Sequence, residues 1–437
     1  MIYNQKIMNP LAIELNEKLS GCVAGRLLSG FGRRIYFPNG IIAQGAQAKK
    51  QAHFANATIG MAYSLGKPLM LSTLARYMPM FTSSEIVAYA PTAGIEEVRI
   101  LWKKLLLEKN PSLNENFISL PVVVPGITAG ISYTADLFLD ETSTILASYP
   151  SWDNYKLIFE DRSGAKLLGI PFFNKEDGLD LEKIGNAIDE EAKKGSVRMI
   201  LNFPNNPSGY SPTKREVDAL SGCFVNAAEK GADVLVICDD AYFGLFYEEE
   251  TCKESIFSHL CGAHERILAV KTDGPTKEDY SWGFRIAMIT MGSKGLNQTQ
   301  FDAINTKLMG TIRSSVSCSN TPAQNFFLKT CGDKNTLPEK EGLFNLLKRR
   351  YKTVKKVVEE NAGNRFLTPL PFNSGYFMCM HCNGIDAELL RKKLLAEHGI
   401  GVVALGQDYI RLAFSSFEEA EIPKVFKIVY KTAGEIQ

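Results

Sequence analysis

Lys277 lies in a loop that joins two apolar segments, and its placement is that of a candidate reactive amine. The loop reads TDGPTKEDYSWGFR (272–285), with RILAVK before it and IAMITM after it. A lysine that is removed from water or placed near another cation has a lowered pKa, and its neutral amine is a nucleophile. Arg285, eight residues later, would supply that cation and positive charge for a phosphate. A solvated surface lysine is the commoner alternative, and Lys271 is a rival without a glycine–arginine partner at this spacing.

Asp239 ends the apolar run VLVIC (234–238), which has the composition of a buried strand. A carboxylate at such a position is unfavourable unless it meets a cation. Tyr242, three residues later, would present its hydroxyl to the same place. A helix-capping aspartate is the alternative, and Asp240 could serve equally well. We favour a functional role for Asp239.

Two further loops also follow apolar runs. Residues 126–130 (GITAG) follow VVV, and glycines with free N–H groups at a helix start are suited to binding an anion. Residues 205–209 (NNPSG) follow the run that ends at Phe203, and the proline holds Asn206 extended, which can direct its amide at a ligand. Taken alone, residues 126–130 are better explained as a tight turn, and a turn is also sufficient for residues 205–209. The sequence has no GxGxxG and no GxxxxGK[ST], so it does not support a dinucleotide site or a P-loop.

The apolar runs that carry these loops predict an α/β fold with a mostly parallel central sheet flanked by helices. Several runs are apolar throughout, as expected when helices cover both faces of a sheet. A capping-box pattern at Thr213–Glu216 predicts a helix that runs through Glu229. Because ligands bind beyond the carboxyl ends of such strands, we expect all four loops in one site. The predicted strands are 122–124, 143–149, 165–170, 198–203, 234–238, 267–271 and 286–291.

The sequence changes character towards both ends, which predicts a second, smaller α+β domain. Its late part has two charged helical segments and two β-like runs, at 338–361, 386–399, 375–380 and 409–414. Its first 80 residues are irregular and glycine-rich around one helical segment, 44–53. We predict an N-terminal arm and part of the small domain in 1–80, the large domain in 81–330, and the rest of the small domain in 331–437. A cleft between the two domains is the expected site.

Composition limits the class of partner. The 437 residues are 45% apolar and 22% charged, enough for a sizeable core, and a net charge of +1 gives no footprint for nucleic acid. The polar start lacks the apolar region of a secretory leader, and no run is typical of a membrane span. Nine scattered cysteines suggest reduced thiols in a cytoplasm, and Cys379 and Cys382 have no second pair at zinc spacing. We expect a small-molecule partner.

Three motifs in order resemble those of the pyridoxal-phosphate (PLP) aminotransferases of fold type I, the class I/II or aspartate-aminotransferase-like family. They are Asn206-Pro-Ser-Gly209, Asp239-x-Ala-Tyr242, and Lys277 with Gly283-x-Arg285. Each motif is weak alone, but their order and spacing together are specific. The resemblance covers roughly residues 56–416.

The resemblance implies a role for each of these residues. Lys277 would form the Schiff base with PLP and shuttle a proton between the substrate Cα and the cofactor C4′. Asp239 would keep the pyridine nitrogen protonated, which makes the ring an electron sink. Tyr242 and Asn206 would bond the 3′ oxygen, and Trp152 would stack on the ring. The phosphate would be held by Arg285 and by the backbone of Gly126, Ile127 and Thr128.

More distant segments resemble the parts of the family that bind substrate or cross to a partner subunit. Arg411, in YIRLAF (409–414), would clamp the substrate α-carboxylate, and Gly60 lies in the segment that closes over it. Tyr89, in YAPTAG, would reach the phosphate of the neighbouring subunit, which implies a homodimer with shared active sites. Arg313 is the candidate for binding a distal carboxylate in the partner's site.

The sequence departs from the family's SxSK pattern ahead of the lysine. Gly274 stands where the family has a phosphate-binding serine, so Thr276 or Thr272 would have to replace that hydroxyl. The two residues that follow Lys277 are both acidic, which is unusual at this place.

The resemblance implies a PLP-dependent aminotransferase that moves an amino group between an amino acid and a 2-oxo acid by a ping-pong mechanism. Aspartate, glutamate and aromatic amino acids are the candidate substrates. A PLP-dependent β-lyase or decarboxylase on the same fold would keep the same residues. A non-catalytic PLP-binding relative is a third interpretation, which the retained Lys277, Asp239, Tyr242 and Arg285 disfavour.

Overall fold

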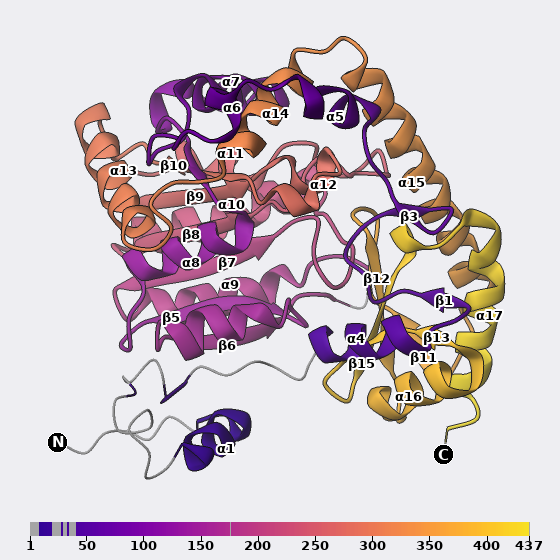
Figure 1. Cartoon of the computed structure of the whole chain (residues 1–437). Coiled ribbons are helices and arrows are strands. Elements are labelled where there is room, and N and C mark those ends of the chain that lie inside the picture. Colours follow the sequence, from indigo (N-terminus) through magenta and orange to yellow (C-terminus); the bar gives the residue numbers. More distant parts are fainter. Residues whose placement is uncertain (1–7, 20–27, 29–32, 35–40, 175, 437) are drawn as a thin grey trace.

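A seven-stranded sheet forms the centre of the protein (Figure 1). The structure is a computed structural model that describes residues 8–19, 28, 33–34, 41–174 and 176–436. The strand order is β4-β10-β9-β8-β7-β5-β6; β5 to β9 pair in parallel, and β10 is antiparallel to β9 and β4. The strands are β4 (Val122–Val124), β5 (Thr144–Tyr149), β6 (Lys166–Pro171), β7 (Ser196–Asn202), β8 (Asp233–Asp239), β9 (Ile267–Asp273) and β10 (Ala287–Gly292). The predicted, mostly parallel sheet is confirmed.

Helices cover both faces of this sheet, which explains why several of its strands are almost entirely apolar. Successive residues of β8 point to opposite faces. Ile237 lies in the core beneath α8, whereas Val236 and Cys238 lie in the core beneath α9, α10 and α11. These helices are α8 (Ile127–Phe138), α9 (Leu181–Ala192), α10 (Lys214–Glu229) and α11 (Ile256–Cys261). The predicted α/β class is therefore confirmed.

The predicted start of α10 is also confirmed. The Thr213 hydroxyl accepts a hydrogen bond from the Glu216 N–H at 3.3 Å, and the Glu216 carboxylate accepts one from the Thr213 N–H at 2.8 Å. These reciprocal bonds satisfy two N–H groups that a helix start leaves without partners. The capping box thus fixes where the chain turns after the loop that follows β7.

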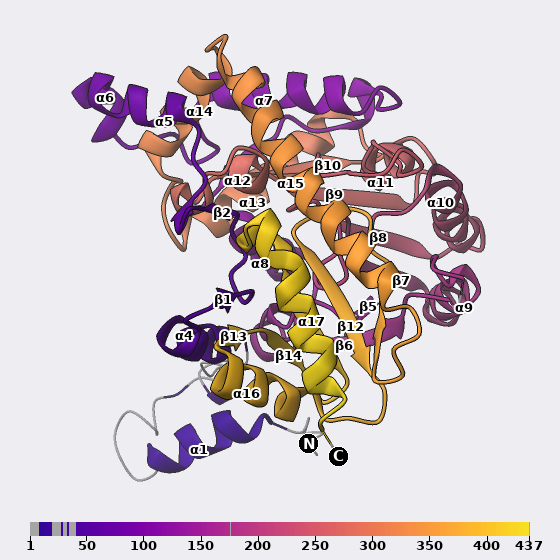
Figure 2. The same cartoon turned by 90° about the vertical axis from the view of Figure 1, so that its right-hand side faces the viewer.

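A smaller, antiparallel sheet lies beside the large one, in the order β11-β12-β15-β14 (Figure 2). From the N-terminal part, helix α4 packs on β14 of this sheet, and strand β1 pairs in parallel with β13 in a separate two-stranded sheet. The elements are α4 (Ile41–Gln51), β1 (Ala55–Asn56), α15 (Thr336–Glu360), β11 (Leu367–Pro369), β12 (Phe377–Cys382), α16 (Ala387–His398), β13 (Ile400–Gly401), β14 (Val403–Leu405), β15 (Tyr409–Ala413) and α17 (Ile422–Ala433). The final helix, α17, was not predicted. The proposed domain boundaries at residues 80 and 330 stay a prediction.

The remaining elements surround these two sheets. The helices and strands are α1 (Pro10–Lys18), β2 (Tyr63–Ser64), β3 (Lys67–Pro68), α5 (Ser72–Tyr77), α6 (Ser83–Ile86), α7 (Glu96–Lys109), α12 (Pro275–Glu278), α13 (Gln298–Arg313) and α14 (Thr321–Cys331). A π-helical segment, η3, spans Lys156–Arg162, and short 3₁₀ turns span Met78–Met80, Glu115–Phe117, Trp282–Phe284, Phe414–Ser416 and Glu419–Glu421.

No helix among the described residues is long and apolar enough to cross a membrane. The polar start of the chain, where no leader is expected, lies largely outside the described residues. Cys379 and Cys382 are buried in β12, and within the described part of the chain no group of histidine, cysteine and acidic residues could hold a metal ion.

Candidate active site

A cavity of about 240 Å³ lies beyond the carboxyl ends of the parallel strands, where loops following β4, β5, β7, β8 and β9 meet β12 and β15. Eleven predicted site residues line it: Gly60, Ile127, Thr128, Trp152, Asn206, Asp239, Tyr242, Thr276, Lys277, Arg285 and Arg411. Thr58, Asn202, Ala241 and Phe377 line it as well and were not predicted. Of the other predicted residues, Gly126 packs against Arg285, whereas Tyr89 and Arg313 lie elsewhere.

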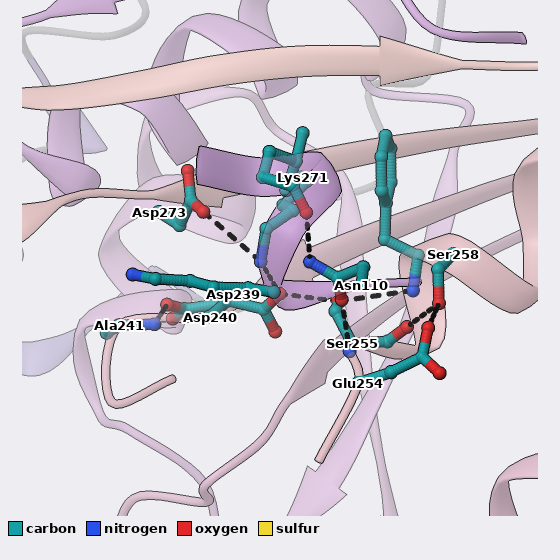
Figure 3. A network of polar contacts seen from close by, with 12 residues as sticks. Asn110, Asp239, Asp240, Ala241, Glu254, Ser255, Ser258, Lys271 and Asp273 are labelled. Carbon is teal, nitrogen blue, oxygen red and sulfur yellow. Dashed lines mark hydrogen bonds and ion pairs between the residues drawn. The ribbon is translucent and has the colours of Figure 1, made fainter. Parts of the chain in front are cut away.

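The structure separates the two candidate lysines. Lys277 lies in the short helix α12, with its amine in the cavity and 5.0 Å from the ring centre of Tyr242. Lys271 is fully buried in β9; its amine contacts Asp240 and lies 3.3 Å from an Asp273 oxygen and 4.4 Å from the Phe243 ring centre (Figure 3). Two carboxylates therefore compensate the positive charge of Lys271 inside the protein, and Lys277 is the lysine that lines the cavity.

The two neighbouring aspartates separate in the same way. Asp239 is the last residue of β8 and lines the cavity, where it accepts a 2.5 Å hydrogen bond from the Tyr155 hydroxyl. Asp240 turns to the other side, where it pairs with Lys271 and accepts a 2.6 Å bond from the Ser255 hydroxyl (Figure 3). Asp240 thus has a structural partner, and Asp239 is the carboxylate of the cavity.

Tyr155 bonds this carboxylate and Asn202 bonds the backbone of the same residue, and neither was predicted. Tyr155 is buried and follows Trp152 by three residues, so the two rings meet edge to face at 5.5 Å. The Asn202 side chain donates to the Asp239 carbonyl and accepts from the Asn206 N–H, both at 2.7 Å. A polar residue ending the apolar strand β7 was a visible signal for Asn202. Tyr155 had no local signal, because its partner is 84 residues away.

Burial governs the protonation of both central groups. Burial raises the pKa of Asp239 to about 6, although the Tyr155 hydrogen bond and Lys277 oppose this change. Burial lowers the pKa of Lys277 to about 8; the Asp239 carboxylate opposes this shift and the Arg285 guanidinium adds to it. An amine with this pKa is substantially neutral slightly above neutral pH and can act as a nucleophile or a base.

Labelling of Lys277 by an acylating reagent should therefore reach half of its maximal rate near pH 8 in the cofactor-free protein and level off above about pH 9. Only the neutral amine attacks the reagent, so the rate follows the fraction of Lys277 that has lost its proton. Peptide mass spectrometry over a pH series measures this rate. A free lysine peptide in the same tube is the control and keeps gaining reactivity to about pH 10. A rate for Lys277 that follows the peptide would contradict the lowered pKa.

An anion cradle forms one end of the cavity. Gly126 caps the twelve-residue helix α8 with a φ of +100°, which favours glycine, and the first N–H groups of a helix have no helical acceptor. A Cβ at Gly126 would lie 2.3 Å from an Arg285 guanidinium nitrogen, so the missing side chain lets the arginine approach the helix start. Backbone N–H groups and a guanidinium together suit a phosphate.

The structure explains the departure at Gly274. A Cβ at Gly274 would lie 2.8 Å from the Ala287 Cα and 3.0 Å from the Ile286 carbonyl oxygen, so β10 leaves no space for a serine there. Thr276 lines the cavity, and its hydroxyl donates to the Ile286 carbonyl at 3.2 Å. Thr272 is fully buried in β9 and does not line the cavity. Of the two threonines, only Thr276 is placed to face a phosphate.

Arg411 closes the other end of the cavity. It is 3% exposed and lies 4.3 Å above the Phe377 ring centre. Its two terminal nitrogens donate to the Asn206 side-chain oxygen at 3.0 Å and to the Thr58 carbonyl at 3.2 Å. Its Nε is buried without a hydrogen-bond partner among the described residues. A buried guanidinium whose two terminal nitrogens bond neutral oxygens is a favourable site for a carboxylate.

Two predicted residues lie on the surface rather than in this cavity. Tyr89 is 92% exposed. Arg313, the last residue of α13, donates to the Ser317 hydroxyl at 3.0 Å. Neither contacts the cavity of its own chain.

This fold, with an amine, a carboxylate and an anion cradle at the strand ends, is that of the fold type I transferases. The chain belongs to the aminotransferase class I and II family, whose sequence model matches residues 70–429. It is therefore an aminotransferase, as the resemblance implied.

Curated relatives agree with this assignment. The chain is 23% identical over 288 residues to a histidinol-phosphate aminotransferase of Methanocaldococcus jannaschii, covering 65% of this chain and 68% of the relative. It is 25% identical over 346 residues to an aspartate/prephenate aminotransferase of Thermus thermophilus, covering 76% and 80%. It aligns with several aspartate aminotransferases over only 36% to 43% of their length.

The fold agrees with that of a solved structure. An aminotransferase of Anaerococcus prevotii superimposes with a TM-score of 0.81, over 92% of this chain and 97% of the other, at 22% identity.

Proposed function

We propose that the protein is a PLP-dependent transaminase that moves an amino group between an amino acid and a 2-oxo acid by a ping-pong mechanism. The observation that carries this proposal is the convergence of Lys277 and Asp239 on one cavity, with an anion cradle at one end and Arg411 at the other. The cavity therefore offers an amine for an aldehyde, a carboxylate for a ring nitrogen and cations for a phosphate and a carboxylate.

The residues of this cavity fit PLP. Gly126, whose absent side chain leaves room for Arg285, forms the phosphate end, and the deeply buried Asp239 can keep a pyridine nitrogen protonated. When bound, the cofactor supplies an electron sink for the bond that breaks at the substrate Cα. The residues that would hold it are Asp239, Tyr242, Asn206, Trp152, Thr276, Lys277, Arg285, Gly126, Ile127 and Thr128.

The chain's own groups would then position the substrate and move its proton. Arg411 would bind the α-carboxylate through two parallel hydrogen bonds, which fixes the Cα within reach of the Lys277 amine. The Lys277 amine, with a pKa near 8, is suited to remove the proton from the substrate Cα and to hold it for a later transfer. The ring of Tyr242, whose centre lies 5.0 Å from this amine, limits the space around it.

A visible spectrum of the PLP-loaded protein, with and without single amino acids, tests this function. We expect glutamate, aspartate or an aromatic amino acid to convert the band of lysine-bound cofactor to that of the amine form, with release of the matching 2-oxo acid. A 2-oxo acid added next should restore the first band. Release of ammonia with pyruvate would instead indicate a β-lyase, and release of CO₂ a decarboxylase. No change with any amino acid would favour a non-catalytic relative.

We further propose that the protein forms a homodimer in which Tyr89 completes the partner's phosphate site. The segment that leads to Tyr89 also exposes three apolar side chains: Val87 is 77% exposed, Met78 58% and Met80 60%. Large apolar side chains exposed so close together in the sequence support the proposal that a second copy covers this segment. Arg313 would then serve the partner's site as well. Sedimentation as a monomer at micromolar concentration would contradict this. A cytoplasmic location stays a prediction.

A further inference from the structure

The Asp239 carboxylate is supported by neutral hydrogen-bond donors rather than by a cation in contact with it. The Tyr155 hydroxyl donates to one of its oxygens at 2.5 Å, and the Ala241 N–H donates to the other at 3.3 Å. Asp239 forms no close ion pair among the described residues, whereas its neighbour Asp240 pairs with Lys271. A buried carboxylate is unfavourable unless such bonds compensate its lost hydration. The short bond from Tyr155 is therefore the main direct support of the charged form.

The fold fixes Tyr155 behind the carboxylate. Its side chain is 2% exposed and does not line the cavity. Trp152 and Phe159 pack on its ring, with centroids 5.5 and 5.8 Å away. The loop after β5 thus sends Trp152 to the cavity and Tyr155 to Asp239. Burial, followed by the charge of Asp239, raises the pKa of Tyr155 well above its usual value, so the hydroxyl keeps its proton and remains a donor.

The other groups around Asp239 do not replace this donor. Burial has the largest effect on the pKa of Asp239 and raises it; the Tyr155 hydrogen bond and Lys277 lower it, and Asp240 raises it. Among the residues that the structure describes, Tyr155 is the one side chain that donates to the carboxylate. Two further cations of the cavity and four uncharged side chains from β7, β8, β9 and the loop after β8 complete the surroundings: Arg285 and Arg411, and Asn202, Cys238, Thr272 and Tyr242.

We propose that Tyr155 is a positioning residue whose hydroxyl keeps the Asp239 carboxylate ionised without neutralising it. A lysine or arginine in its place would form an ion pair with the carboxylate and would compete with a protonated ring nitrogen in the cavity. A phenol supports the negative charge through a hydrogen bond and leaves that charge available. The inference rests on the proposed function for the cation that Asp239 would bind, but not for the action of Tyr155 on Asp239.

Tyr155→Phe removes this donor and keeps the ring. The charged form of Asp239 then becomes less favourable, so we expect its pKa in the folded protein to rise from about 6 by roughly 1 to 2 pH units, the effect of one hydrogen bond to a charged group. A raised carboxylate pKa lowers stability only above the pKa of the unfolded chain, and the loss grows until the pKa of the folded state is passed. The equilibrium constant for unfolding should therefore increase roughly ten- to fiftyfold more at pH 8 than at pH 5.

Denaturant unfolding of the full cofactor-free chain at pH 5 and pH 8 measures this difference. Tyr247→Phe is the matched control, because Tyr247 is also 2% exposed and its hydroxyl donates to the Gly375 carbonyl at 2.8 Å. That acceptor does not titrate, so this variant should lose the same stability at both pH values. In an Asp239→Asn background, Tyr155→Phe should likewise have the same effect at both pH values.

A purely structural role of the Tyr155 hydroxyl would not produce this dependence on pH. An equal effect of Tyr155→Phe at pH 5 and pH 8, or a pH-dependent effect that persists in the Asp239→Asn background, would overturn the proposal. If the single variant does not fold at pH 8, the double variant must fold there, and its failure to do so would overturn the proposal as well. These measurements use neither PLP nor an amino acid, so the proposed transaminase activity can fail in its spectral test independently.

Discussion

Replacing Lys277 with alanine is expected to reduce turnover by roughly 10⁴-fold or more while leaving the protein folded. The change removes both the nucleophilic amine and the group placed to move the substrate proton, and acid–base catalysis alone contributes about 10²–10⁴-fold. Lys277 forms no close ion pair among the described residues, so its loss breaks none, and the buried Asp239 that loses this nearby cation can take up a proton because its pKa is already raised to about 6. Single-turnover kinetics with glutamate and thermal unfolding of the same samples measure the two effects.

Lys271→Ala is the matched control, because we expect the loss of this rival lysine to lower stability and not to abolish turnover. It is fully buried between Asp240 and Asp273, and its removal would leave two buried carboxylates without their cation. Breaking a buried pair in this way costs about 3–5 kcal/mol of folding free energy. We expect unfolding at lower temperature or denaturant, with residual activity in whatever fraction stays folded. Unchanged turnover in Lys277→Ala, or a stable but inactive Lys271→Ala, would reverse the assignment of the two lysines.

Asp239→Asn is expected to lower turnover of the loaded enzyme by roughly 10²–10⁴-fold. The carboxylate is the group placed to pair with a protonated ring nitrogen, and losing one member of a buried charge pair costs about 3–5 kcal/mol. The cofactor should still bind covalently, because Lys277 and the anion cradle are unchanged. The test is the rate of the amino-acid-dependent spectral change. A variant with full rate would exclude Asp239 from the mechanism.

The same substitution should stabilise the cofactor-free protein above pH 6. Burial raises the pKa of Asp239 from 3.8 to about 6, which corresponds to a penalty of about 3 kcal/mol for the folded, charged form. This penalty is fully present at pH values above about 6 and disappears as the pH falls towards 4. Replacement by asparagine therefore stabilises the folded protein above about pH 6 and has little effect near pH 4. Asp240→Asn is the control and should destabilise instead, because it deprives Lys271 of a close partner. Denaturant unfolding at pH 5 and pH 8 separates these outcomes.

Much of the fold could be predicted from the sequence, because the segments whose apolar pattern predicts a strand are also the segments that the structure buries. All seven predicted strands of the central sheet are present with boundaries within two residues, since both-sided burial requires runs of apolar residues. The family, too, followed from three short motifs, because each follows the end of a strand and their order and spacing together are specific. The final helix α17 was missed, although its apolar residues recur at helical spacing.

The sequence by itself determined which residue types the site contains, through the order of Asn206, Asp239, Lys277 and Arg285 along the chain. Only the tertiary structure decided between Lys271 and Lys277 and between Asp239 and Asp240. The choice depends on whether a side chain points into the cavity at the strand ends or away from it, and neighbouring residues of the chain point in different directions. It also brought Tyr155 to Asp239 and set Lys340 against the acidic pair beyond Lys277. These contacts join residues that are 61 to 84 positions apart in the chain, and no local pattern encodes them.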